Sequence, residues 1–365
     1  MTDDLFSPLE LRGTEIPNRV MVSPMCQYSC EDRDGLATEW HRTHLGARAT
    51  GRAGVVMTEA TAVEPRGRIS PEDLGIWSGE HADALAPITE FIRSQGSVPA
   101  IQLAHAGRKA STRRPWEGRG PLQPDEGGWN VVAPSAIPYP GHESPVEVAA
   151  LSREEIAQLV ETFADAAGHA LDAGFEIAEI HAAHGYLLHE FLSPVANDRD
   201  DEYGGSFENR IRFLLEVTAA IRDVWPADRP LFVRLSGTDW LPDRESWTVE
   251  QSARLADRLA DAGVDLIDVS SGGIHPEQQL PPSGPNYQVP LAEHVREHTS
   301  EDVGIGAVGG ITTPEGADAL IRNDRADLAI VGREFLRDPQ FPLRAARELD
   351  ALDRIDVPPQ YERAF

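Results

Sequence analysis

Residues 304–334 read GIGAVGGITTPEGADALIRNDRADLAIVGRE. Two short apolar runs, Gly304–Gly310 and Leu328–Glu334, enclose a stretch with the spacing of an amphipathic helix, Pro314–Asn323. Parallel neighbouring strands need a crossover connection, and this connection is usually a helix. The segment therefore indicates one strand–helix–strand unit of a parallel sheet.

The same alternation extends back to the N-terminus. Six further apolar or β-branched runs are predicted strands: Asn18–Pro24, Gly54–Val63, Val98–Gly107, Phe175–His184, Leu231–Gly237 and Leu266–Gly272. Helical patterns include Ser152–Ala173, Ser206–Val224, Thr248–Ala262 and Pro339–Leu349. Eight strands alternating with helices favour a (β/α)8 TIM barrel over a doubly wound sheet, and we expect one domain over residues 1–365.

Two segments depart from this regular alternation. Residues 108–150, after the third strand, are rich in Pro and Gly and too long for a simple turn. Loops at this end of a strand lie on the catalytic face of a barrel, so the insertion is expected to form a lid or substrate wall. Residues 356–365 (DVPPQYERAF) are predicted to be an extended tail, because Pro358 and Pro359 disfavour a helix.

The composition excludes several classes of partner. The net charge is −27, from 60 acidic and 33 basic residues, and Lys109 is the only lysine. Acidic residues spread along the chain argue against binding to nucleic acid or anionic membranes. No segment approaches the ~18 apolar residues of a membrane span, and the N-terminus lacks a signal-peptide pattern. We expect a cytoplasmic protein, and surplus carboxylate with Arg in place of Lys is typical of adaptation to concentrated salt.

Polar and glycine residues follow the predicted strands, where a barrel places its active site. The positions are Ser23–Tyr28, Glu59–Thr61, Gln102, His105, His181–Tyr186, Arg234, Gly309, Gly310, Gly332 and Arg333. The glycine pairs and Arg333 follow strands seven and eight, which predicts a phosphate site. The string GIGAVG is not a dinucleotide fingerprint, because its glycines lie within the strand instead of opening a helix.

His181 and His184 (HAAH) can face one site only if the strand ends near His181 and the chain turns over the barrel mouth. No carboxylate cluster accompanies them, so no metal is expected, and two imidazoles suit hydrogen bonding to a developing oxyanion. Lys109 fits neither a Schiff-base site nor a phosphate-binding Walker loop. Cys26 and Cys30 are too few for an iron–sulfur cluster and are expected to be free thiols.

Strand periodicity also predicts a buried charge. Residues 177, 179 and 181 share one face of their strand, as do 232, 234 and 236. If His181 and Arg234 face the barrel interior, Glu179 does too. An unpaired buried carboxylate is costly, so Glu179 is predicted to pair with Arg234 or another interior donor.

Seven segments occur in a recognisable order: SPMCQYS (Ser23–Ser29), TEAT (Thr58–Thr61), QLAHAGRKA (Gln102–Ala110), HAAHGYLLHEFLSP (His181–Pro194), NDRDDEYGGSFENRIRF (Asn197–Phe213), VRLS (Val233–Ser236) and QYER (Gln360–Arg363). Together they resemble the Old Yellow Enzyme family of FMN-dependent ene-reductases along nearly the whole chain. The resemblance is closest to the subclass described as thermophilic-like.

The resemblance implies an FMN site and assigns its contacts. One side of the flavin would be lined by Ser23, Pro24, Met25 and Cys26, with Ala60 and Gln102 along the ring. Arg234 would lie at the N1/C2-carbonyl edge. The phosphate would be held by Gly309, Gly310, Gly332 and Arg333.

The resemblance also implies a substrate site and a partner subunit. His181 and His184, helped by Tyr28, would bind the substrate carbonyl oxygen, and Tyr186 would supply a proton to the α-carbon. Arg363 would reach the active site of a neighbouring subunit in a homodimer or homotetramer. The implied reaction is ping-pong reduction of an enone by NAD(P)H; the alternative is reduction of nitro-esters, quinones or other xenobiotics on the same site.

Overall fold

A computed structural model describes residues 3–118, 120–142, 146–300 and 302–365. Eight parallel strands close into a barrel in the order β10-β11-β12-β3-β4-β5-β8-β9. Their bounds are β3 Val20–Val22, β4 Val55–Ala62, β5 Val98–Ala104, β8 Ile177–Ala182, β9 Leu231–Ser236, β10 Leu266–Ser270, β11 Gly304–Val308 and β12 Leu328–Val331. Each lies within one of the eight predicted runs, so the predicted (β/α)8 TIM barrel is confirmed.

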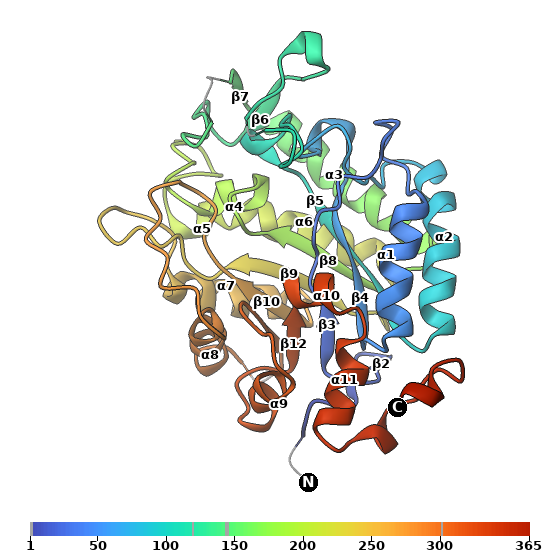
Figure 1. Ribbon diagram of the computed structural model, residues 1–365. Coiled ribbons are helices and arrows are strands. Elements are labelled where there is room, and N and C mark those ends of the chain that lie inside the picture. The colour runs from blue at the N-terminus through green and yellow to red at the C-terminus, as the bar shows by residue number, and fades with distance from the viewer. Residues whose placement is uncertain (1–2, 119, 143–145, 301) are drawn as a thin grey trace.

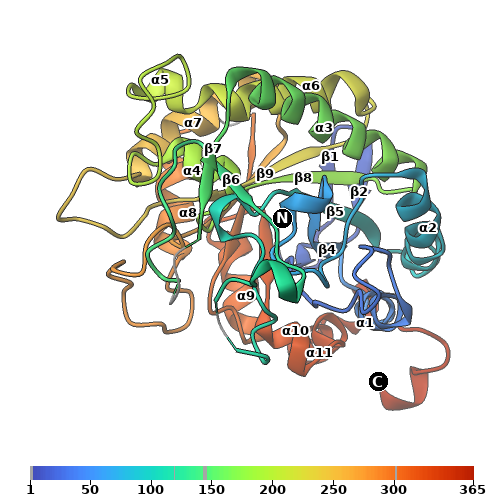
Figure 2. The same ribbon diagram turned by 90° about the horizontal axis from the view of Figure 1, so that it is seen from above.

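Helices form a ring outside the strands (Figures 1 and 2). They are α1 Glu39–Thr50, α2 Gly79–Ser94, α3 Arg153–Asp172, α4 Leu187–Leu192, α5 Phe207–Arg210, α6 Arg212–Val224, α7 Val249–Asp261, α8 Val289–Glu297, α9 Pro314–Arg322, α10 Arg333–Arg337 and α11 Phe341–Glu348. In the part of the chain that the structure describes, none of them is long and apolar enough to cross a membrane.

Helix starts follow local sequence signals. Ser152 caps α3 and exchanges hydrogen bonds with Glu155 in a capping box, as the SREE sequence predicts. Thr248 and Gln251 do the same for α7. The helix predicted over Ser206–Val224 forms as two helices, α5 and α6, with a break at Ile211. The break coincides with Arg210, whose guanidinium is buried and donates to the carbonyl of Leu192.

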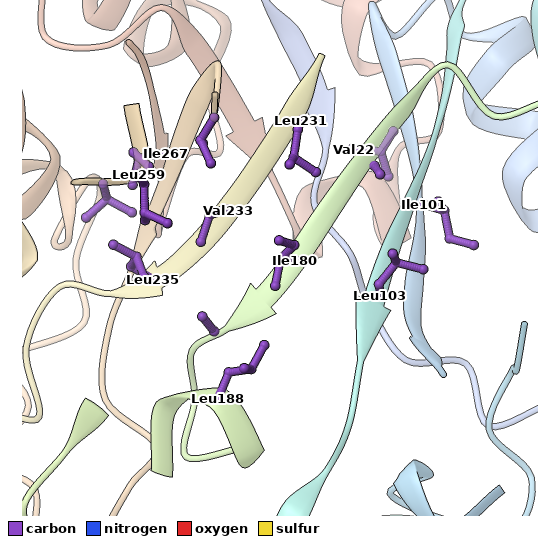
Figure 3. Packing of buried hydrophobic residues seen from close by; sticks show 14 of the residues in the cluster. Val22, Ile101, Leu103, Ile180, Leu188, Leu231, Val233, Leu235, Leu259 and Ile267 are labelled. Atoms are coloured by element: carbon purple, nitrogen blue, oxygen red, sulfur yellow. The ribbon is translucent and has the colours of Figure 1, made fainter. Parts of the chain in front are cut away.

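Side chains alternate between the barrel interior and the surrounding helices. The outward set packs against the helices; Figure 3 shows Ile180 of β8, Val233 and Leu235 of β9, and Ile267 of β10 beside Leu259 of α7. The inward set forms a separate apolar cluster at the base of the barrel, made by Ile16, Met21, Val55, Met57, Val98, Ala100, Ile177, Phe232, Leu266, Val308, Leu328 and Ile330. Above it the interior becomes polar, which leaves the chemistry at the upper end.

Short elements close both ends of the barrel. Below it, β1 (Leu9–Leu11) and β2 (Thr14–Ile16) form an antiparallel pair. The insertion 108–150 includes a pair of short strands, β6 (Val131–Ala133) and β7 (Val148–Ala150), and residues 119 and 143–145 of it lie outside the described residues. Figures 1 and 2 place β6 and β7 over one end of the barrel. The described residues also form 3-10 turns: η1 Pro65–Gly67, η2 Gly107–Lys109, η3 Pro124–Glu126, η4 Leu352–Arg354 and η5 Glu362–Ala364.

Candidate active site

The two histidines meet at the end of β8. The strand ends at Ala182, and His184 adopts a left-handed backbone with φ of 60°. This turn brings Nδ1 of His184 to 3.4 Å from Nε2 of His181, although the residues are three apart. The condition set by the sequence, a strand ending near His181, is confirmed.

The surroundings of the two rings set their protonation. The backbone N–H of Ala183 donates to Nδ1 of His181 at 3.2 Å, so the neutral ring carries its proton on Nε2. Nε2 of His184 lies 2.7 Å from the hydroxyl of Ser270. Burial, and to a smaller extent the charge of Arg234, lowers the pKa of both imidazoles well below its usual value. Both rings are therefore neutral near pH 7 and available as N–H donors.

Tyr186 borders the histidine pair, and Tyr28 lies near Tyr186 and Cys26. The ring of Tyr186 stands edge-on to His181 with centroids 5.1 Å apart. Burial raises the pKa of Tyr186 well above its usual value, and the nearby Cys26 sulfur, followed by burial, raises the pKa of Tyr28. Both phenols remain protonated. Tyr28 also contacts exposed Trp116, at 5.7 Å between ring centroids, so the insertion lies beside this tyrosine.

A buried polar layer lies below the histidines. The side-chain amide of Gln102 donates to Glu179 at 2.7 Å, and Nε of Arg234 lies 3.0 Å from a carboxylate oxygen of Asp268. The prediction that Glu179 faces the interior and pairs with a donor there is confirmed, with Gln102 as the donor. Arg234 takes its ion pair with Asp268, and its Nη2 donates to Ser23 at 3.1 Å.

The loop after β3 brings the predicted flavin-side residues to the barrel mouth. Cys26 is half-buried, Cys30 is fully buried, and both are free thiols as predicted. Burial, with smaller effects from Asp73 and Glu59, raises the pKa of the Cys26 thiol well above its usual value. Cys26 is therefore a neutral thiol, not a thiolate nucleophile.

A cavity of about 470 Å³ opens at the ends of β11 and β12. Its lining includes Met25, Gly309, Gly310, Gly332 and Arg333. Gly309 and Gly310 have φ of 121° and 75°, which L side chains rarely adopt. A Cβ on Gly332 would meet only Ser23 at 3.8 Å and Met25 at 4.0 Å, so it would project into open space beside the loop after β3.

This cavity fits the phosphate end of FMN. Glycine backbone at strand ends favours a dianion, and loops seven and eight of a barrel are a frequent phosphate site. The cavity includes Met25, and Ser23 of the same loop contacts Arg234. The predicted FMN contacts are therefore connected from Arg333, through the loop that contains Met25 and Ser23, to Arg234. Two further predicted contacts, Ala60 of β4 and Gln102 of β5, lie opposite each other on neighbouring strands.

Four residues of this site were not selected from the sequence as site residues. Asp268 and Ser270 belong to the sixth strand, from which no candidate was taken; the strand-end rule applied to LIDVSSG would have found Ser270. Lys109 was set aside because it matches no motif, yet it donates to the carbonyl of His184 at 2.8 Å. No sequence pattern marks Trp116 as a site residue, because its contact with Tyr28 depends on the path of the insertion.

The C-terminal tail departs from the extended conformation predicted for residues 356–365. The N–H of Tyr361 donates to the carbonyl of Pro358 and that of Ala364 donates to Tyr361, which turns the chain into η5. Tyr361 lies in a groove between α1 and α2, and Arg363 is exposed. In Figure 1 the tail lies beside the lower ends of these helices, at the opposite end from β6 and β7.

Comparison with known proteins identifies the family. The family model of the NADH:flavin oxidoreductase / NADH oxidase family matches residues 4–351. An NADPH dehydrogenase of Bacillus pumilus (strain SAFR-032) is 47% identical over 366 residues, covering 100% of both chains. Another, of Geobacillus thermodenitrificans (strain NG80-2), is 45% identical and covers 100% of this chain and 99% of its own.

A solved structure agrees with these relatives. The old yellow enzyme homologue from Zymomonas mobilis superposes with a TM-score of 0.77 at 27% identity, covering 98% of each chain. The glycine-lined cavity, Arg234 and the histidine pair thus lie in a barrel whose relatives are NAD(P)H-dependent. The chain belongs to the NADH:flavin oxidoreductase / NADH oxidase family and is an FMN-binding, NAD(P)H-dependent oxidoreductase.

Proposed function

We propose that the protein reduces the activated C=C bond of α,β-unsaturated carbonyl compounds in a ping-pong reaction with NAD(P)H. The observation that carries this proposal is the neutral pair formed by buried His181 and half-buried His184 at the mouth of an FMN-binding barrel. FMN bound in this site would supply the hydride chemistry that links NAD(P)H oxidation to reduction at the alkene β-carbon. The protein's task is to make the alkene electron-poor at that moment.

The histidines serve this task by hydrogen bonding. At 3.4 Å the contact between their ring nitrogens is long, so any hydrogen bond there is weak. The Nε2–H of His181 can therefore donate to a substrate oxygen instead, at little cost in free energy. Donors placed where negative charge develops are worth most in a water-poor site. Ser236 and Ser270 hold His184 from two sides, at its backbone N–H and its Nε2, so the ring is oriented before substrate binds.

Tyr186 is suited to the proton transfer that completes the reduction. Its hydroxyl stays protonated near pH 7 because burial raises its pKa. Its ring packs on His181, which binds the carbonyl end of the substrate in this proposal. A proton delivered by Tyr186 would then reach the α-carbon, one bond away from that carbonyl.

The proposal is tested by separating the two half-reactions. NADPH added anaerobically to the purified yellow protein should bleach its visible flavin band, and cyclohexenone should then restore the band with formation of cyclohexanone. Bleaching without recovery across a panel of enones would overturn the proposal and leave only the family activity.

We further propose that the tail completes a neighbouring subunit's site, as the resemblance to the thermophilic-like subclass implies. Support comes from the exposed side chain of Arg363 and from the QYER motif that carries the resemblance, whereas Tyr361 lies against α1 and α2 of its own barrel in this single chain. Truncation after Pro359 should weaken substrate use by about 10- to 100-fold, the equivalent of one charged hydrogen bond of about 1.5–3 kcal/mol. Steady-state kinetics with flavin content as control would test this, since the flavin contacts come from the host barrel. Unchanged KM and turnover in the truncated protein would refute it.

Salt adaptation is a separate proposal, supported by the net charge of −27. Repulsion among these charges destabilises the folded state. The Debye length is about 3 Å in 1 M salt and about 10 Å in 0.1 M salt, so the repulsion is screened much more strongly at the higher salt concentration. The melting temperature and activity should therefore fall steeply when salt is lowered from molar to about 0.1 M. Calorimetry across a KCl series measures this, and a constant melting temperature would contradict salt adaptation.

A further inference from the structure

Lys109 is the only lysine in a chain with 33 basic residues. It ends η2, shortly after β5, and its side chain is half-buried. This ammonium donates to two backbone carbonyls, of His184 at 2.8 Å and of Gly273 at 3.1 Å. These carbonyls belong to the loops that follow β8 and β10, so one side chain joins three strand ends.

The two joined loops press against each other in unusual backbone conformations. His184, Gly185 and Gly273 have φ of 60°, 73° and 93°. A Cβ on Gly185 would lie 2.3 Å from the carbonyl oxygen of Gly273, and one on Gly273 would lie 2.4 Å from the backbone of His184. Left-handed backbone costs free energy in a residue other than glycine, and it persists where the surroundings hold it. The ammonium of Lys109 is such a hold on His184.

The same ammonium lies against two aromatic rings. Its Nζ is 4.8 Å from the ring centroid of Tyr186 and 5.0 Å from that of Tyr139 in the insertion. Both distances are within the range of cation–π attraction. Lys109 therefore contacts both a histidine and a tyrosine of the proposed substrate site, together with the segment that covers it.

A guanidinium does not replace this ammonium easily. An ammonium is compact and directs three donors around one nitrogen, whereas a guanidinium is a flat fork. The neighbouring Arg108 shows the difference, because its guanidinium donates to the carbonyls of Ile274 at 2.8 Å and Ile137 at 3.3 Å instead of to the histidine loop. The chain uses arginine at every other basic position, yet it keeps lysine here.

We propose that Lys109 is a positioning residue, whose ammonium holds the His184 backbone and the Tyr186 ring in the geometry that the reaction needs. The inference rests on the proposed roles of His181, His184 and Tyr186. The inference adds that these roles require a positive charge at the carbonyl oxygens of His184 and Gly273.

The charge on Lys109 depends on pH in an accessible range. Burial lowers the pKa of Lys109 to about 8, while Glu190 of α4 opposes the shift and Arg108 adds to it. The other groups that face it are Tyr139 and His142 of the insertion and His184 and Tyr186 beyond β8. Because a lysine is charged below its pKa, positioning is complete at neutral pH and is lost as the pH rises through about 8.

Two substitutions separate charge from shape. Lys109→Met keeps the length of the side chain but removes the ammonium, and it should lower kcat for enone reduction by ~10²-fold, as a small misplacement of reacting groups does. Lys109→Arg keeps the charge at all accessible pH values, so part of the rate should return and the fall in kcat near pH 8 should disappear. The matched control is Arg254→Met, which removes an exposed cation of α7 that lies 4.0 Å from the Phe207 ring and pairs with Glu208.

A measurement on the unaltered holoenzyme covers the case in which a variant fails to fold. With [13C]lysine the chain gives a single side-chain signal, because it contains one lysine. The signal should titrate well below the usual lysine pKa of about 10.4 and shift when a phenol occupies the site. A signal that titrates near 10.4 and ignores the phenol, or a folded Lys109→Met protein with full turnover, would overturn the inference. If histidine variants also kept full turnover, the proposed function itself would fall.

Discussion

Alanine at either His181 or His184 is expected to slow enone reduction by ~10²–10³-fold, the cost of removing one donor to a developing oxyanion. Each ring supplies an N–H at a fixed place: His181 is buried, and half-buried His184 is held at its Nε2 by the hydroxyl of Ser270. Phenol binding should weaken in the same variants, since a phenolate resembles the oxyanion. Rapid mixing of cyclohexenone with NADPH-reduced enzyme measures the step directly.

The chain offers a matched control for this experiment. His294 and His298 form another close pair at the C-terminal end of α8, stacked at 4.2 Å between centroids, and His298 is exposed. His298→Ala should leave the rate unchanged. Because burial lowers the pKa of His181 and His184 well below its usual value, the rate should show no loss from imidazole titration between about pH 6 and 8. Full turnover in both site variants would rule the assignment out.

The strand runs and the positions at their ends could be predicted because both depend on local sequence. An apolar, β-branched run bounded by Gly or Pro is recognisable without knowing its neighbours. A barrel then places every strand end on one face. This is why Gly309, Gly332 and the HAAH turn could be assigned to a common site before their distances were known.

Helix α1 was not predicted, and its packing explains why. Buried positions on α1 include His41 and Arg48, which interrupt any apolar stripe. Arg48 is accommodated because its guanidinium donates to the carbonyl of Phe335 at 2.7 Å, and His41 lies 3.0 Å from the buried carboxylate of Glu59. Both partners are distant in sequence, so the periodicity of apolar residues within α1 cannot predict these contacts.

The side-chain partners of Glu179 and Arg234 in the barrel interior could not be predicted from the sequence either. The strand face of Glu179 followed from alternation, but its partner depends on register between strands. In the structure Arg234 lies opposite Asp268 on one side and His181 on the other, while Glu179 lies opposite Gln102. This register gives the guanidinium of Arg234 to Asp268 and leaves Glu179 with a neutral amide.

The resulting charge balance is uneven. Asp268 and Glu179 are both fully buried, and Arg234 is the cation beside them. Burial, together with the negative charge of Asp268, raises the pKa of Glu179, while Arg234 opposes the rise. Burial also raises the pKa of Asp268, again against Arg234. One carboxyl therefore keeps its proton near neutral pH, and Glu179, bonded to an amide, is the one that keeps it.

Removing Arg234 should expose this balance as a large loss of stability. Arg234→Met leaves Asp268 buried without its cation, and breaking a buried pair in this way costs about 3–5 kcal/mol. Adding Asp268→Asn should recover most of the loss, because the second change removes the unpaired charge. Both proteins lack Arg234, so any weaker hold on FMN is common to them and cancels. Urea unfolding of the single and double variants near pH 7 measures the difference.

The pH dependence identifies the charge responsible. Without Arg234 the pKa of Asp268 in the folded state rises further above its unfolded value of about 3.9. The folded protein then binds the proton more tightly, so its stability falls as the pH rises from about 4 towards that higher pKa. The gap between Arg234→Met and Arg234→Met/Asp268→Asn should therefore be small near pH 4 and widen towards about pH 7. A gap that does not change with pH would mean that lost packing around the Arg234 side chain, and not an uncompensated carboxylate, sets the stability of the polar layer.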